Sequence, residues 1–170
     1  VANVEDGSVS VIDTQALSEV ARIPVGSAPV QVAFTPAGDR VYVSLRDENR
    51  VAVIDTASRE VTRRIHVGPN PLQTFVTPDG AYVYGANQRT EAAPNDTVSV
   101  IGTATGQVVK TLTTGGGAHG VSASADGALV FVTNIADDTV SIIDVRRQEV
   151  VKTVPVGDRP NGIVYGSGSR

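Results

Sequence analysis

Short apolar runs rich in Val, Ile and Thr alternate with turn-forming residues along the entire chain. Runs such as "VSVID" and "VYVSL" are separated by clusters of Gly, Pro, Asp and Asn. β-Branched residues favour strands, and the clusters between them favour tight reversals of the chain. The 3.6-residue spacing of an amphipathic helix is not the dominant pattern. The sequence therefore predicts many short β-strands joined by turns.

One of these runs recurs four times, which predicts a repeat architecture. The motif reads "VSVIDT", "VAVIDT", "VSVIGT" and "VSIIDV", and it starts at Val9, Val51, Val98 and Val140. A second motif follows each copy, and its four copies align with one another without a gap: "IPVGSAPVQVAF", "IHVGPNPLQTFV", "LTTGGGAHGVSA" and "VPVGDRPNGIVY". A unit of about 40–45 residues that holds four strands is typical of a β-propeller blade.

Each unit is expected to contain four antiparallel strands, named A to D from the inside of the propeller outward. We predict an all-β propeller with blades over residues 29–68, 71–114 and 118–157. A fourth, split blade would combine residues 160–170 with residues 1–25. Such a pairing of the two ends of a chain removes open sheet edges.

Several residues recur at fixed positions in the repeat, and we interpret them as structural. The glycine before each strand A is expected to supply an unusual backbone angle. The aspartate that ends strand C is expected to fix the following turn by accepting hydrogen bonds from backbone N–H groups. These positions are Gly26, Gly68, Gly115 and Gly157, then Asp13, Asp55 and Asp144, with Asn134 closing one strand B.

The stretch "GGGAHG" has the glycine spacing of a dinucleotide-binding fingerprint, at Gly115, Gly117 and Gly120. That fingerprint requires a helix whose N-terminus meets the phosphates. Here a strand A is predicted to follow, so we interpret the glycines as part of a linker between blades.

Composition narrows the function classes. The formal net charge is −4, which argues against binding to nucleic acid because that requires a basic face. The chain has no Cys, which excludes disulfides and thiolate chemistry and suits an exported protein. No apolar run is long enough to span a membrane.

Two segments, Val41 to Gly68 and Val130 to Ile163, resemble the YVTN-family β-propeller repeat. The naming tetrapeptide survives as "FVTN" at Phe131 to Asn134. The resemblance implies a surface-layer or secreted bacterial propeller that is extracellular, on the cell surface or periplasmic. It further implies a non-catalytic scaffold or binding module with no cofactor and with a protein or cell-surface partner.

The resemblance leaves the size of the ring open. A closed ring of four blades and a part of a larger propeller of about seven blades both fit the sequence.

Any ligand or partner is expected on the face that carries the D–A and B–C loops, because these loops are the less regular ones. His119 is the sharpest candidate, since no other repeat has a His at that position. At the start of strand A, His119 would lie near the mouth of the central channel. Other polar residues expected around this mouth are Gln31, Gln73, Asn161, Gln88, Arg89 and Glu91.

An enzyme is the alternative. It would be a cofactor- or metal-dependent propeller, haem d1-like, lactonase-like or lyase-like, that uses His119 at the channel mouth. No catalytic motif such as G-x-S-x-G or H-E-x-x-H is present in the sequence. His66, the other histidine, is expected on the surface of an outer strand.

Overall fold

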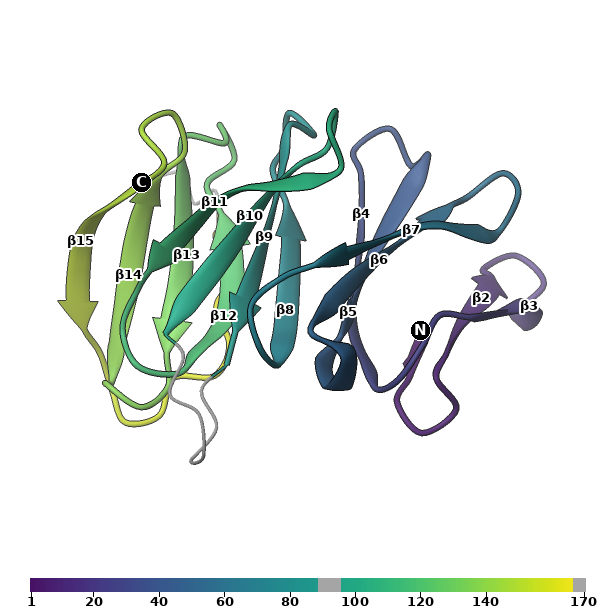
Figure 1. The fold of residues 1–170 in the computed structure, drawn as a ribbon, viewed down its shortest axis with the longest axis horizontal. Helices are drawn as coiled ribbons and strands as arrows, with labels where there is room; N and C mark the ends of the chain where they lie inside the picture. The colour runs from purple at the N-terminus through teal and green to yellow at the C-terminus, as the bar shows by residue number, and fades with distance from the viewer. Residues whose placement is uncertain (89–95, 167–170) are drawn as a thin grey trace.

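The computed structural model describes residues 1–88 and 96–166, and within these residues the protein consists of antiparallel β-sheets. Four sheets follow one another along the chain and fan out side by side (Figure 1). The only helical turn among the described residues is η1 (Arg46–Glu48), a single 3-10 turn. The all-β propeller fold predicted from the repeat is confirmed.

The first sheet has three strands and the other three sheets have four each. Sheet 1 contains β1 (Ala2–Asn3), β2 (Ser8–Asp13) and β3 (Ser18–Pro24). Sheet 2 contains β4 (Pro29–Phe34), β5 (Arg40–Leu45), β6 (Arg50–Asp55) and β7 (Glu60–His66). Sheet 3 contains β8 (Pro71–Val76), β9 (Tyr82–Asn87), β10 (Thr97–Gly102) and β11 (Gln107–Thr113). Sheet 4 contains β12 (Ala118–Ala123), β13 (Leu129–Asn134), β14 (Thr139–Asp144) and β15 (Glu149–Pro155).

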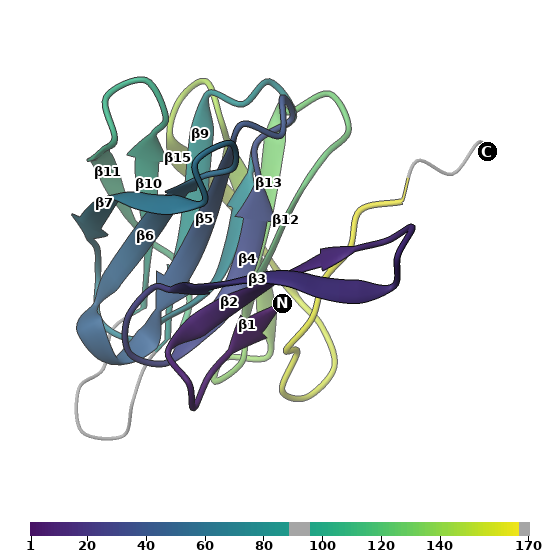
Figure 2. The same ribbon diagram turned by 90° about the vertical axis from the view of Figure 1, so that its right-hand side faces the viewer.

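The sheets pack as wedges, which means that neighbouring sheets are closer at their inner strands than at their outer strands. The first strands of sheets 2, 3 and 4 lie beside one another, with contacts from β4 to β8 and from β8 to β12, whereas the outer strands β7 and β11 barely touch (Figures 1 and 2). The inner strands thus form one continuous wall, and this wall is where a propeller has its central channel.

Apolar side chains fill the space between consecutive sheets. One face of sheet 2 packs on sheet 1 through Val43 and Ala52, and its other face packs on sheet 3 through Val51 and Val53. Val43, Val51 and Ala52 have no exposed surface. A strand that is covered on both faces must be apolar at consecutive positions, which explains the unbroken apolar runs in the sequence.

The outer strands carry a β-bulge in each sheet. The register between the third and fourth strands of sheet 2 shifts between Val53 and Ile54, and the other sheets shift at the equivalent place. Bulges and charged residues on an edge strand hinder pairing with another edge. Arg63, Lys110 and Lys152 lie on these outer strands.

The segment from 156 to 166 forms no strand and lies against sheet 4. The Tyr165 N–H donates to Ser122 Oγ at 3.2 Å, and the Tyr165 ring stacks on Phe131 at 6.0 Å between centroids. No described residue of this segment pairs with β1, so sheet 1 keeps three strands. Closure of a ring by residues 160–170 stays a prediction, and residues 167–170 lie outside the described part of the chain.

The expectation about the repeated glycines is wrong for three of the four positions. Only Gly26 has a positive φ, of 129°, and the positive angles in the other linkers occur two residues later, at Asn70, Gly117 and Arg159. Gly68 and Gly115 are required for a different reason: the structure leaves no room for a Cβ at either position. A Cβ on Gly115 would lie 2.7 Å from Asn134 Nδ2, and a Cβ on Gly68 would overlap the Asn87 amide.

The two asparagines that press on these glycines are buried and tied to the neighbouring strand. Asn134 Nδ2 donates to Thr139 Oγ1 and Ser141 Oγ, both at 2.9 Å. Asn87 Nδ2 donates to Thr97 Oγ1 and Ser99 Oγ, both at 3.0 Å. The B–C hairpin therefore holds the asparagine in place, and the linker glycine fits closely over it.

We expect Gly115→Ala to lower the free energy of unfolding by about 1–3 kcal/mol, because the added methyl group overlaps a side chain that cannot move freely. Urea denaturation followed by circular dichroism measures this change. Gly157→Ala is the matched control, since a Cβ there meets nothing within 4 Å. Equal losses for the two variants would show that the Asn134 contact is not the cause.

Candidate cofactor site

His119 lies on the inner wall, at the start of β12. The pairing of β12 with β13 is regular at Ala118 and again from Val121, but the register shifts between them, so His119 sits in an irregular stretch of the strand. The side chain is half-buried, and Nδ1 is buried without a hydrogen-bond partner among the described residues. One imidazole nitrogen is thus not committed to the fold.

Gly120 brings the C-terminal segment next to this stretch. The Gly120 N–H donates to Thr133 Oγ1 at 2.7 Å. A Cβ on Gly120 would lie 2.9 Å from the carbonyl oxygen of Asn161. Asn161 therefore lies beside the strand that carries His119, as its repeat position predicts.

Of the two predicted glutamines, Gln73 lies nearer to β12. The Gln73 Oε1 atom accepts a hydrogen bond from the Val121 N–H at 3.3 Å and so links β8 to β12. Gln31 is on β4, one strand further along the wall, where its N–H donates to Ser44 Oγ at 3.0 Å.

The loop residues predicted for the same mouth are described only in part. Gln88 follows β9, and its N–H donates to the Asn70 carbonyl at 3.0 Å. Arg89 and Glu91 lie outside the described residues. The structure therefore places the Gln73 amide and the Asn161 backbone beside the residues that follow His119, and the role of every predicted site residue stays a prediction.

Side chains of the B–C loops hold the linkers that lead into strand A. Glu48 Oε1 accepts from the Ser27 N–H at 2.6 Å, Asp137 Oδ2 from the Gly116 N–H at 2.6 Å, and Asp138 Oδ1 from the Arg159 N–H at 2.7 Å. These contacts link residues 21 positions apart in sequence. No signal in the sequence indicates this use of the loop carboxylates, because each acceptor and its donor lie in different segments of the chain.

The aspartates that end strand C bond to the backbone of the turns that follow. Asp13 Oδ1 accepts from the Gln15 and Ala16 N–H groups, both at 2.8 Å, and Asp55 Oδ1 accepts from the Ser58 N–H at 2.8 Å. The backbone N–H groups lower the pKa of Asp13, and the backbone and hydroxyl of Ser58 lower the pKa of Asp55, because they stabilise the ionised carboxylates.

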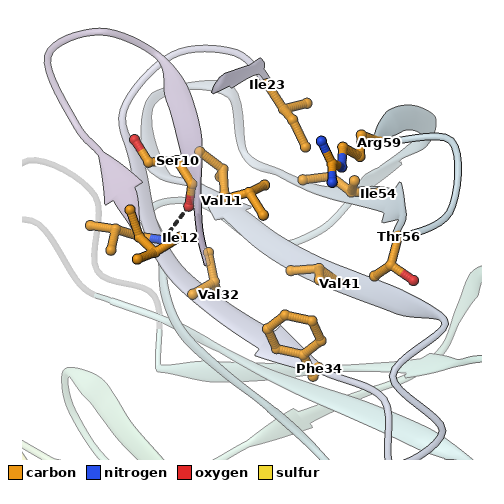
Figure 3. Close-up of a pocket in the computed structure, with 12 residues that line it drawn as sticks. Ser10, Val11, Ile12, Ile23, Val32, Phe34, Val41, Ile54, Thr56 and Arg59 are labelled. Atoms are coloured by element: carbon orange, nitrogen blue, oxygen red, sulfur yellow. Dashed lines mark hydrogen bonds between the residues drawn. The ribbon is translucent and has the colours of Figure 1, made fainter. Parts of the chain in front are cut away.

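An apolar groove of about 320 Å³ lies between sheets 1 and 2 (Figure 3). Val11, Ile12, Val32 and Phe34 are among the apolar side chains that face it, and Arg59 stands at its rim (Figure 3). No residue of β8 or β12 lines this groove. It is therefore separate from His119, and its walls offer little chemistry beyond apolar contact.

Comparison with known families assigns residues 1–88 to the cytochrome D1 heme domain. The match covers just over half of the chain. The protein belongs to the cytochrome D1 heme domain family. Its only histidine within the matched residues is His66, which is exposed on β7, and His119 lies outside them.

Among solved structures, hydrazine synthase from Kuenenia stuttgartiensis is similar over 89% of this chain, with a TM-score of 0.84 and 25% sequence identity. The chain covers 44% of that structure, so it spans less than half of the length of this relative. A comparison with curated proteins found no match.

These findings correct two expectations. The family match to a heme domain and the likeness to an enzyme contradict the non-catalytic scaffold and the absence of a cofactor. They support the alternative, a cofactor-dependent enzyme propeller. The error came from the YVTN resemblance, which rests on the blade motifs that propellers of different functions share.

The residues of this chain fit a haem group in one respect. A single neutral imidazole is a common axial ligand of haem iron, and His119 offers a ring nitrogen without a described partner on the inner wall. No group of three His, Asp or Glu side chains among the described residues could hold a metal ion by itself. A porphyrin supplies four iron ligands of its own, so such a cluster is not required.

We expect Asp137→Ala to loosen the linker before His119, because the Gly116 N–H loses its carboxylate acceptor. The Gly116 amide should exchange with solvent faster, and the free energy of unfolding should fall by about 0.5–1 kcal/mol. Hydrogen exchange followed by NMR measures the first effect. Asp137→Asn keeps an oxygen acceptor and should stay close to the parent protein; equal exchange in all three proteins would contradict the assigned role.

Proposed function

We propose that this chain is part of a haem-dependent propeller enzyme in which His119 binds the iron. The observation that carries the proposal is that Nδ1 of His119, on the inner wall, is buried and has no hydrogen-bond partner in the part of the chain that the structure describes. The match to the cytochrome D1 heme domain supports the cofactor class. The similarity to hydrazine synthase supports an enzyme, because that relative is named for a reaction.

The haem would supply redox chemistry at its iron, and the chain would supply binding and orientation. His119 would hold the iron through an imidazole nitrogen. The irregular start of β12 is braced on both sides, by the Gly120 N–H on Thr133 and by the Gln73 amide on the Val121 N–H. This bracing fixes the strand that presents His119, and a side chain that holds a metal would need such support.

The described sheets form an open fan (Figures 1 and 2). In a closed propeller their inner strands would line part of the central channel. This chain covers 44% of the hydrazine synthase structure. The proposal therefore concerns the cofactor and the residue that binds it.

Location and partner remain parts of the proposal. A periplasmic site suits a cytochrome D1 domain and the absence of Cys. No helix within the described residues is long and apolar enough to cross a membrane. A protein partner, inferred from the YVTN resemblance, would use the face of the D–A and B–C loops.

The proposal predicts that added haem d1 binds with a shifted visible absorption band and that His119→Ala removes this shift. His66→Ala is the matched control, because His66 is exposed on an outer strand and should leave the spectrum unchanged. Circular dichroism shows whether each variant is folded. A spectrum that is the same in the parent protein and in folded His119→Ala would overturn the assignment of the ligand.

A further inference from the structure

A polar cleft of about 350 Å³ lies between sheets 2 and 3, in the half of the fold that carries the C–D turns. Its walls come from β5, β6 and β7 of sheet 2 and from the turn at residues 103–106 of sheet 3. This volume is at the lower end of the range for small-molecule sites, about 300–1,000 Å³. No residue of the inner strand β12 lines the cleft, so it is separate from the proposed cofactor site.

Two guanidinium groups line the cleft. Arg63 Nη1 donates to the Thr105 carbonyl at 2.7 Å and to the Gly106 carbonyl at 3.2 Å. Arg63 makes no ion pair and uses neither Nε nor Nη2 in a hydrogen bond among the described residues. Arg40 Nη1 donates to the Thr103 carbonyl at 3.2 Å. Arg40 Nε also lies 3.6 Å from Asp39 Oδ2 in an ion pair. Arg63 is therefore anchored by one nitrogen and Arg40 by two, and each guanidinium has donors left for a ligand.

A tyrosine side chain also belongs to the cleft. Tyr42 is only 1% exposed, it lines the cleft, and its hydroxyl has no hydrogen bond to another described residue. A hydroxyl that the fold does not use can donate a hydrogen bond to a polar ligand group in the cleft.

The interface between sheets 3 and 4 shows which side chain lies at the position equivalent to this cleft. Tyr84 in sheet 3 is the repeat equivalent of Tyr42, since Tyr84 pairs with Val100 as Tyr42 pairs with Val53. The Gln148 side chain lies close enough to the Tyr84 hydroxyl to oppose the effect of burial, which raises the pKa of Tyr84 to about 12. Gly106 is the equivalent of Gln148, and both have a positive φ, of 61° and 52°.

Between sheets 2 and 3, a glycine thus replaces the side chain that approaches the tyrosine at the next interface. A Cβ on Gly106 would overlap the Arg63 guanidinium, so the arginine occupies the space that a longer residue would take. The arginine pair is special to this interface as well. The equivalents of Arg40 and Arg63 are Tyr82 and Lys110.

We propose that this cleft binds a small organic carboxylate. A carboxylate is planar and takes hydrogen bonds from a guanidinium fork and from a tyrosine hydroxyl at once. Asp55 also lines the cleft, but it accepts hydrogen bonds from its own turn through Ser58, and Asp39 is paired with Arg40. Arg63 has no carboxylate partner among the described residues, so it is the cation left for a ligand.

Titration of the full chain with succinate tests the proposal, with calorimetry for the affinity and NMR shifts of the Thr105 and Gly106 amides for the place. Gly106→Gln copies the filled interface and should weaken binding by at least about tenfold. Gln148→Gly opens the other interface, which lacks the arginine pair, and should bind as the parent does.

Neutral succinamide and inorganic sulfate complete the test. Both should bind at least about tenfold more weakly than succinate, because one lacks the charge and the other lacks the planar shape. Arg63→Lys, which keeps the charge and loses the fork, is the second variant if Gly106→Gln does not fold, and it should also weaken binding. Absence of succinate binding, equal binding by Gly106→Gln or by folded Arg63→Lys, or equal binding of sulfate would each overturn the proposal.

Discussion

Burial of both faces of each sheet against its neighbours is the interaction on which the rest of this structure depends. A four-stranded sheet of this size exposes two apolar faces, and neither can be left in water. Sheet 2 meets this constraint by packing Val43 on sheet 1 and Val51 on sheet 3. Stacked wedges of this kind place every inner strand on one wall, which is how residues more than 40 positions apart come to share a site.

The space between the wedges decides where polar chemistry can occur. Where the facing turn carries Gln148, its side chain fills the gap beside Tyr84, and where it carries Gly106, a cleft with two arginines remains. The backbone has a positive φ at both positions. A repeat protein can therefore vary one interface without altering the others, because each sheet contacts only its two neighbours.

The cofactor proposal follows the same logic on the inner wall. His119 replaces residues that are Val30, Leu72 and Asn161 in the other repeats, so the blade itself does not require it. Its strand is held by Thr133 and Gln73, and its Nδ1 has no described partner. A residue that the fold does not need, on a strand that the fold braces, is well placed for function. The family match adds the class of group that such a histidine would bind.

The sequence by itself determined that the chain is built from repeated four-stranded blades. The four copies of the strand C motif and the turns between them predicted the all-β propeller, because alternation, turn chemistry and repeat period are local properties. It also singled out His119 from the repeat alignment alone. The tertiary structure decided what local patterns cannot show: that Gly68 and Gly115 are required by the asparagines above them, and that Glu48 and Asp137 hold linkers 21 residues away. It also decided that the two arginines share one cleft. These features depend on how linkers, loops and neighbouring sheets pack in three dimensions, which the order of residues along one strand does not specify.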